Sequence, residues 1–163
     1  MKINQKVMSY EDVLKLPRLQ RRKPLKPQMW LMTIVWIVCS FTLRNIKFSY
    51  TTERMELVKD QPCLILMNHA SFIDLKIAST ILYPRPFNIV CTADGLVGKK
   101  WLMRQLGCIP TQKYVPDIRL VRDMVHAVRK NKCSVLMYPE AGYSFDGTST
   151  SLPDTTGALI KML

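Results

Sequence analysis

Residues 64–74 read Leu-Ile-Leu-Met-Asn-His-Ala-Ser-Phe-Ile-Asp, and they form the most informative segment of the chain. A short apolar run ends abruptly in His69, and a carboxylate follows five residues later. The pattern predicts a buried strand over residues 63–67 and a helix over residues 71–82. His69 then lies at a strand end, and Asp74 lies in the next helical turn. A histidine that acts as a general base needs a partner that fixes its tautomer, and Asp74 is placed to be that partner.

Strands and helices alternate along the rest of the chain. Further strands are expected at residues 87–91 and 134–138, and further helices at residues 99–106, 117–130 and 154–163. Repeated strand–helix units predict an α/β fold with a largely parallel sheet flanked by helices. Asp117 is expected to cap its helix, whose apolar stripe comprises Ile118, Val121, Val125 and Val128. Because a helix in an α/β fold normally leads into another parallel strand, the chain is expected to be incomplete at its C-terminus, with a natural terminal helix as the alternative.

Two further polar segments accompany the predicted strands. Residues 138–144 read Tyr-Pro-Glu-Ala-Gly-Tyr-Ser and follow the strand at 134–138. Sites in parallel sheets gather at the carboxyl ends of strands, so His69 and Glu140 are expected to face one cleft. Residues 107–113 follow a predicted helix and end in Lys113, which we interpret as a cation that holds an anionic group.

Each candidate also has a purely structural interpretation. Ser71 to Asp74 fits a capping box, in which the carboxylate only accepts a bond from a backbone N–H. Gly107 fits the end of a helix, and Pro139 fits the end of a strand. Lys113 and Glu140 are also typical of solvated surface charges, and His126 is expected to be an exposed helix residue.

The chain of 163 residues is long enough for one domain with a core, and its 48% hydrophobic content argues against disorder. Lys and Arg outnumber Asp and Glu by 24 to 12, which favours an anionic partner. Five widely spaced cysteines contain no Cys-x-x-Cys pair. Free thiols in a reducing, cytoplasmic setting are therefore expected, and no metal site is expected.

The N-terminal part combines charge with an apolar run. Residues 1–28 are basic, and residues 29–43 are uncharged and mostly apolar but shorter than the ~20 residues of a spanning helix. Trp30 and Trp36 suit a membrane interface. We therefore expect residues 1–48 to form a basic arm with a membrane-associating helical segment, and residues 49–163 to form the α/β domain. A buried core helix with a solvated arm is the alternative, and nucleic-acid binding is disfavoured because no exposed aromatics interleave the basic cluster.

These three segments together resemble motifs of the glycerolipid acyltransferases, a family that includes the lysophosphatidic acid acyltransferases. Asn68 and His69 with Asp74 resemble the family's Asn-His-x4-Asp signature. Residues 107–113 resemble its second block, with Lys113 in place of the usual Arg. Residues 138–144 resemble its Phe-Pro-Glu-Gly-Thr-Arg-Ser block, with Tyr143 at the Arg position. A fourth block, an apolar strand ending near a proline, is expected beyond Leu163.

The resemblance implies a membrane-associated O-acyltransferase on the cytoplasmic face of the cell membrane. The donor is an acyl-CoA or acyl carrier protein thioester, no cofactor is needed, and the acceptor is a lysophospholipid, with phosphatidic acid as the expected product. His69 would be the catalytic base and Asp74 its orienting partner. The implied substrate-binding residues are Asn68, Ser71, Gly107, Lys113, Pro139, Glu140 and Ser144. Alternatives are an inactive remnant that binds anionic lipid, and a hydrolase using Ser144, which lacks a Gly-x-Ser-x-Gly elbow.

Overall fold

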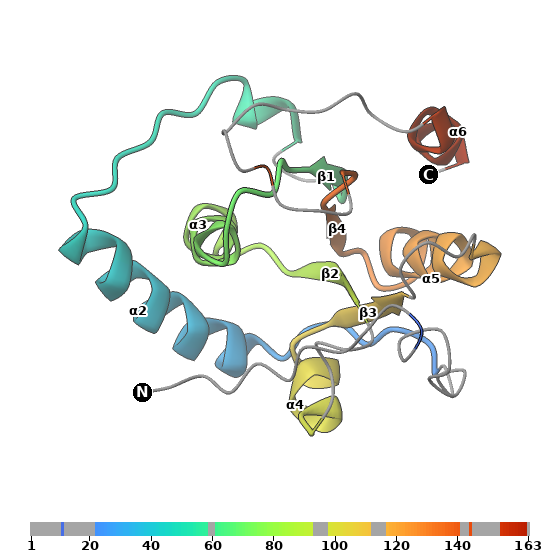
Figure 1. Ribbon diagram of the computed structural model, residues 1–163, viewed down its shortest axis with the longest axis horizontal. Coiled ribbons are helices and arrows are strands. Elements are labelled where there is room, and N and C mark those ends of the chain that lie inside the picture. The colour runs from blue at the N-terminus through green and yellow to red at the C-terminus, as the bar shows by residue number, and fades with distance from the viewer. Residues whose placement is uncertain are drawn as a thin grey trace.

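The computed structural model describes residues 11, 22–58, 61–92, 98–111, 117–140, 144 and 154–162. Four parallel strands form one sheet: β1 (Leu64–Leu66), β2 (Phe87–Thr92), β3 (Cys108–Thr111) and β4 (Ser134–Met137). Their order across the sheet is β1-β4-β2-β3. The predicted α/β fold with a parallel sheet flanked by helices is therefore confirmed (Figure 1).

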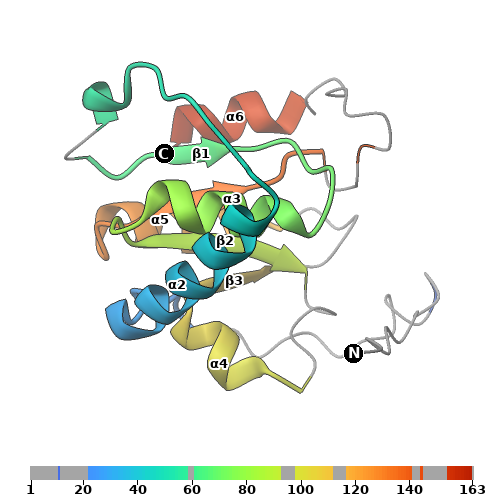
Figure 2. The same ribbon diagram turned by 90° about the vertical axis from the view of Figure 1, so that its left-hand side faces the viewer.

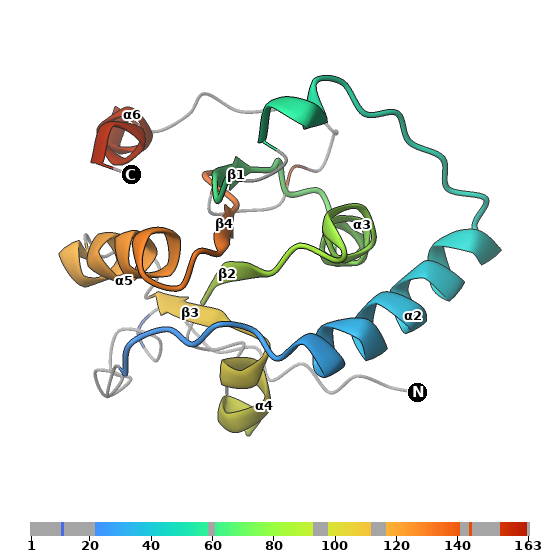
Figure 3. The ribbon, with the colours of Figure 1, turned by 180° about the vertical axis from the view of Figure 1, so that it is seen from behind.

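Helices cover both faces of this sheet. On one side lie α2 (Met29–Asn45) and α3 (Ile73–Leu82), and on the other lie α5 (Ile118–Arg129) and α6 (Asp154–Met162), as Figures 1 and 3 show. The short α4 (Lys100–Gln105) lies beside the β3 edge, and a 3-10 turn spans Met55–Val58. All four helices predicted beyond residue 48 are present, with ends that differ by one or two residues.

The core consists of two apolar layers, one on each face of the sheet. Alternate strand residues point to opposite faces, so Val135 packs toward α5 while its neighbour Leu136 packs toward α3 and α2. The α5 layer is centred on Ile109, Met124 and Ala127, which are fully buried. This period of two also determines that Tyr138, two residues after Leu136, belongs to the α3 side.

Two sequence predictions for α5 have different outcomes. Asp117 caps the helix as predicted, because its Oδ1 accepts bonds from Arg119 N at 3.0 Å and Leu120 N at 3.4 Å. The prediction that Ile118 belongs to the buried stripe is wrong, since this side chain is 69% exposed. The buried residues of the helix are Met124 and Ala127, and Val121 and Val128 pack against the same core cluster. An apolar stripe expected on α6 from Ala158, Leu159 and Leu163 falls on side chains outside the described residues.

The segment before α2 crosses the amino ends of the strands. Pro24 O accepts a bond from Asn131 Nδ2 at 3.0 Å, and Leu25 O accepts one from Asn88 Nδ2 at 2.8 Å. The backbone N–H of Gln28 then donates to Gln105 O at 3.0 Å. Residues 24–28 therefore fasten the start of α2 to the loop before β4, to β2 and to the end of α4.

Helix α2 packs against α3 through one face. Trp36 stacks on Tyr83 with ring centroids 4.7 Å apart, and Thr33 Oγ1 lies 3.2 Å from the Tyr83 hydroxyl. Met32, Cys39 and Leu43 are buried on the same stripe as Trp36, and Leu31 is also buried. Trp36, which the sequence placed at a membrane interface, thus faces the protein. Among the described residues, no helix is both long and apolar enough to cross a bilayer.

Gly107 shows how tightly this segment is packed. Its φ of +80° is unfavourable for other residues, and a Cβ there would lie 2.6 Å from Pro27 Cγ and 2.8 Å from Asn88 Nδ2.

We predict that Gly107→Ala lowers the free energy of unfolding by more than a left-handed backbone alone would cost, which is about 1–2 kcal/mol. Gly98→Ala is the matched control, because Gly98 has a φ of +77° with open space around it. Urea unfolding of both variants checks this, and equal losses would contradict the packing argument.

Candidate active site

The strand order brings two polar loops together. β1 pairs directly with β4, and the last pair in register is Leu66 with Met137. His69 and Glu140 each lie three residues beyond this pair, at the carboxyl edge of the sheet. The ladder continues one step further, because Met67 N donates to Met137 O at 3.2 Å. Neighbouring strands lie about 4.8 Å apart, so the loop after β1 and the loop after β4 start side by side.

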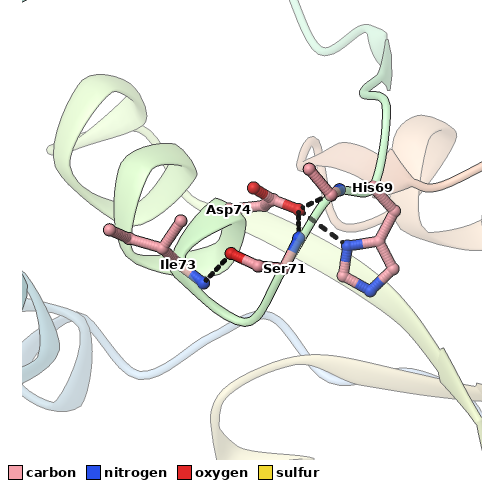
Figure 4. A network of polar contacts seen from close by, with 5 residues as sticks. His69, Ser71, Ile73 and Asp74 are labelled. Atoms are coloured by element: carbon pink, nitrogen blue, oxygen red, sulfur yellow. Dashed lines mark hydrogen bonds and ion pairs between the residues drawn. The ribbon is translucent and has the colours of Figure 1, made fainter. Parts of the chain in front are cut away.

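One carboxylate oxygen organises the first loop. Asp74 Oδ2 lies 2.9 Å from His69 Nδ1 and accepts bonds from Ala70 N at 2.8 Å and Ser71 N at 2.9 Å (Figure 4). Ser71 Oγ in turn accepts a bond from Ile73 N at 3.2 Å. Asp74 thus makes half of the predicted capping box and also contacts the histidine. The two interpretations of this carboxylate are therefore compatible.

The two side chains of the His69–Asp74 pair differ in burial. The side chain of Asp74 is 8% exposed, whereas that of His69 is 21% exposed. A buried carboxylate that accepts three donors is fixed in position, and a proton on Nδ1 is the arrangement that satisfies its contact with His69. Figure 4 shows the second ring nitrogen, Nε2, directed away from the carboxylate. Nε2 is therefore the atom with the geometry of a general base.

A second contact fixes the plane of the imidazole. The rings of His69 and Tyr138 stack with centroids 4.0 Å apart and an angle of 19° between their planes. Asp74 contacts the edge of the imidazole, whereas Tyr138 covers one of its faces. Together the two neighbours leave His69 little freedom about χ1 and χ2. Sequence reasoning missed this role for Tyr138, although its position at a strand end beside Pro139 was the available signal.

We predict that Tyr138 is a positioning residue. Tyr138→Phe keeps the stacked ring and is expected to retain, within about 2-fold, the kcat of the acyl transfer that the family resemblance implies. Tyr138→Leu removes the ring, and because an aromatic pair contributes about 0.5–1.5 kcal/mol, kcat should fall about 5- to 10-fold with KM unchanged. Steady-state kinetics on both variants checks this. A fall in both variants, or a change confined to KM, would contradict a positioning role.

The other candidate residues of the first and third blocks lie in the two loops after β1 and β4. Ser144 N donates to His69 O at 2.6 Å, so the loop after β4 contacts the loop after β1 directly. Asn68 and Ser71 are exposed on the first loop, Pro139 is buried, and Glu140 is half-buried. Ser71, Ser144 and the His69–Asp74 pair are therefore brought together by hydrogen bonds.

Two residues of the second block are not brought to this site by the described structure. Gly107 precedes β3 and lies at the amino edge of the sheet, opposite the edge where His69 lies. Its conformation and its contacts with Pro27 and Asn88 explain why a glycine occurs there. Lys113 follows β3 and lies outside the described residues, as do residues 141–143 of the third block.

The family model described as Acyltransferase matches residues 47–162. The chain belongs to the acyltransferase family. The resemblance to glycerolipid acyltransferases is thereby confirmed, and the His69–Asp74 pair lies within the matched region. Searches of curated proteins and of solved structures found no match.

The geometry of the His69–Asp74 pair is consistent with the chemistry of acyl transfer. A thioester is already activated, so transfer to a hydroxyl requires a base for the hydroxyl proton but no protein nucleophile. Asp74 holds Nδ1 of His69 and leaves Nε2 on the other side of the ring. The arrangement resembles the histidine–carboxylate half of a triad without its serine.

Proposed function

We propose that this acyltransferase moves a fatty acyl group from a thioester to the hydroxyl of a lysophospholipid at a membrane surface. The observation that supports this most is the 2.9 Å contact between His69 Nδ1 and the buried Asp74 carboxylate. This contact holds the proton on Nδ1, so that Nε2 carries the lone pair that accepts the proton of a substrate hydroxyl. The acceptor we favour is 1-acylglycerol 3-phosphate, whose product is phosphatidic acid in phospholipid biosynthesis.

In the proposed reaction His69 transfers one proton from the acceptor hydroxyl to the leaving thiol. The acceptor hydroxyl attacks the thioester carbonyl carbon while His69 Nε2 takes the hydroxyl proton. Asp74 stabilises the imidazolium that forms. The tetrahedral intermediate then collapses, the C–S bond breaks, and the thiol leaves with the proton from His69. The products are an ester and free coenzyme A or acyl carrier protein thiol.

The family resemblance supplies the proposed acceptor contacts. Glu140, half-buried at the end of β4, would position the glycerol part of the acceptor. Lys113 would hold the phosphate as a mobile point charge, without the bidentate geometry of arginine. Asn68, Ser71, Pro139 and Ser144 would shape the surroundings of the hydroxyl.

Membrane association is part of this proposal. The outward face of α2 carries large exposed apolar side chains, namely Trp30 at 59%, Ile34 at 50%, Ile37 at 55%, Val38 at 59% and Phe41 at 68%. They recur at helical spacing along one stripe and form an exposed apolar face of the kind that contacts lipid. Phe72, 71% exposed beside the catalytic loop, extends apolar surface toward the site. The five free cysteines suit the cytoplasmic face.

The test is acyl transfer by the purified chain in lipid vesicles. Labelled acyl-CoA or acyl carrier protein thioester is supplied with lysophosphatidic acid, and a monoacylglycerol that lacks the phosphate is the matched acceptor. Labelled phosphatidic acid is the expected product, with little transfer to the monoacylglycerol. Preference for the acceptor without phosphate would overturn the acceptor assignment. No transfer by folded, vesicle-bound protein would favour an inactive lipid-binding remnant.

A further inference from the structure

The three tryptophans of the chain have different surroundings. Trp36 stacks on Tyr83 between α2 and α3. Trp30 is 59% exposed on the outer face of α2, and Trp101 is 68% exposed on α4. Leu102, the neighbour of Trp101, is 39% exposed. A six-residue helix that presents both Trp and Leu to solvent is unusual for a surface that contacts only water.

The start of α2 and the end of α4 are joined. Gln28 N donates to Gln105 O at 3.0 Å, directly before α2 begins and at the last residue of α4. Trp30 lies two residues after this junction, and Trp101 lies one helical turn before it. Figure 2 shows α2 and α4 diverging from this region on the same flank of the molecule. We call this surface the tryptophan flank: Trp30, Ile34 and Phe41 of α2 with Trp101 and Leu102 of α4.

The charged residues of the two segments that contain α2 and α4 are all basic. Lys99 and Lys100 are exposed at the start of α4, next to Trp101. No Asp or Glu occurs between residues 13 and 52 or between residues 95 and 116, the two stretches that contain α2 and α4. Exposed Trp beside Lys is the combination that anchors proteins at a lipid–water interface. An acidic protein partner would satisfy the lysines but not the long apolar stripe of α2.

We propose that α4 is a second lipid-contacting element, which binds the same anionic phospholipid surface as α2. This inference deepens the membrane association proposed above and rests on it. Trp101 and Leu102 enter the interface beside Trp30, and Lys99 and Lys100 contact lipid phosphates. Because the Gln28–Gln105 bond joins the two helices, the α/β unit is held to the membrane at two places and keeps a fixed tilt on it.

Single-tryptophan variants of the full chain test each contact separately. The chain has three tryptophans, so each double variant keeps one of them as the emitter. Trp30 remains in Trp36→Phe/Trp101→Phe, Trp36 remains in Trp30→Phe/Trp101→Phe, and Trp101 remains in Trp30→Phe/Trp36→Phe. Each variant, its fold checked by circular dichroism, is mixed with phosphatidylglycerol vesicles that contain brominated phosphatidylcholine. Trp30 and Trp101 are expected to lose at least half of their emission, and Trp36 much less. Quenching of Trp30 without quenching of Trp101 overturns the inference, as does quenching of neither.

A charge comparison tests the lipid class. Lys99→Gln/Lys100→Gln removes two cations beside Trp101, and should weaken binding to phosphatidylglycerol vesicles by roughly 30-fold. Arg122→Gln/Lys130→Gln is the matched control, because these exposed residues lie on and just after α5, on the other side of the sheet. Equal losses in the two variants overturn a role for α4. Acyl transfer to a detergent-dispersed acceptor is measured in parallel, so that loss of the proposed function and loss of the lipid contact are told apart.

Discussion

Replacing His69 with alanine is expected to lower kcat for acyl transfer by about 10³-fold. Nε2 of this imidazole is the proposed proton acceptor, and the variant has no other base held in this geometry by Asp74. Because His69 is only 21% exposed and stacks on Tyr138, its removal should lower the free energy of unfolding by about 0.5–1.5 kcal/mol, a loss that leaves the chain folded. Steady-state kinetics and urea unfolding on the same preparation separate the two effects.

His126→Ala is the matched control for this prediction. His126 is the only other histidine of the chain, and it lies in α5 on the other side of the sheet. Its replacement should leave kcat within about 2-fold. Retained transfer in the folded His69→Ala variant would refute the general-base mechanism, even if the chain still binds lipid.

Replacing Asp74 with asparagine is expected to lower kcat roughly 10²-fold with little loss of stability. Oδ2 of Asp74 accepts bonds from both Ala70 N and Ser71 N. These two donors will orient the asparagine so that its carbonyl oxygen, rather than its NH2 group, takes the same place. The loop and the histidine tautomer are then preserved, and what is lost is the negative charge that stabilises the imidazolium.

Asp74→Ala distinguishes the structural role of this residue from its catalytic role. Alanine removes the acceptor for two backbone N–H groups at the start of α3, which should lower the free energy of unfolding by about 1–2 kcal/mol. The comparison is made by urea unfolding together with kcat for both variants. If Asp74→Asn kept full activity while Asp74→Ala unfolded more easily, Asp74 would be a helix cap and no more.

Local sequence patterns were sufficient for most elements of the fold. The apolar runs before His69 and Tyr138 predicted β1 and β4, and the polar cap at Asp117 predicted the start of α5. These signals are local, because burial of a strand and capping of a helix depend on a few consecutive residues. The Asn-His-x4-Asp spacing also sufficed to predict the contact of His69 with Asp74, since a strand end and the next helical turn bring them together.

Strand β3 was missed for a reason that the structure makes clear. Its four residues include Pro110, which cannot donate to a sheet ladder. The strand lies at the edge of the described sheet and pairs only with β2, with Pro110 opposite Cys91. A proline is tolerated in such a place, and only the order of the strands reveals it.

The fold class, the contact of His69 with Asp74 and the family could all be predicted from the sequence, because each depends on residues close together in the chain. Three features required the tertiary structure: β1 lies beside β4, Tyr138 stacks on His69, and Trp36 faces α3 while Trp101 faces outward. These contacts join residues far apart in the sequence, and similar apolar patterns are compatible with several strand orders and helix orientations. The packing of the two core layers around Val135 and Leu136 selects one of them.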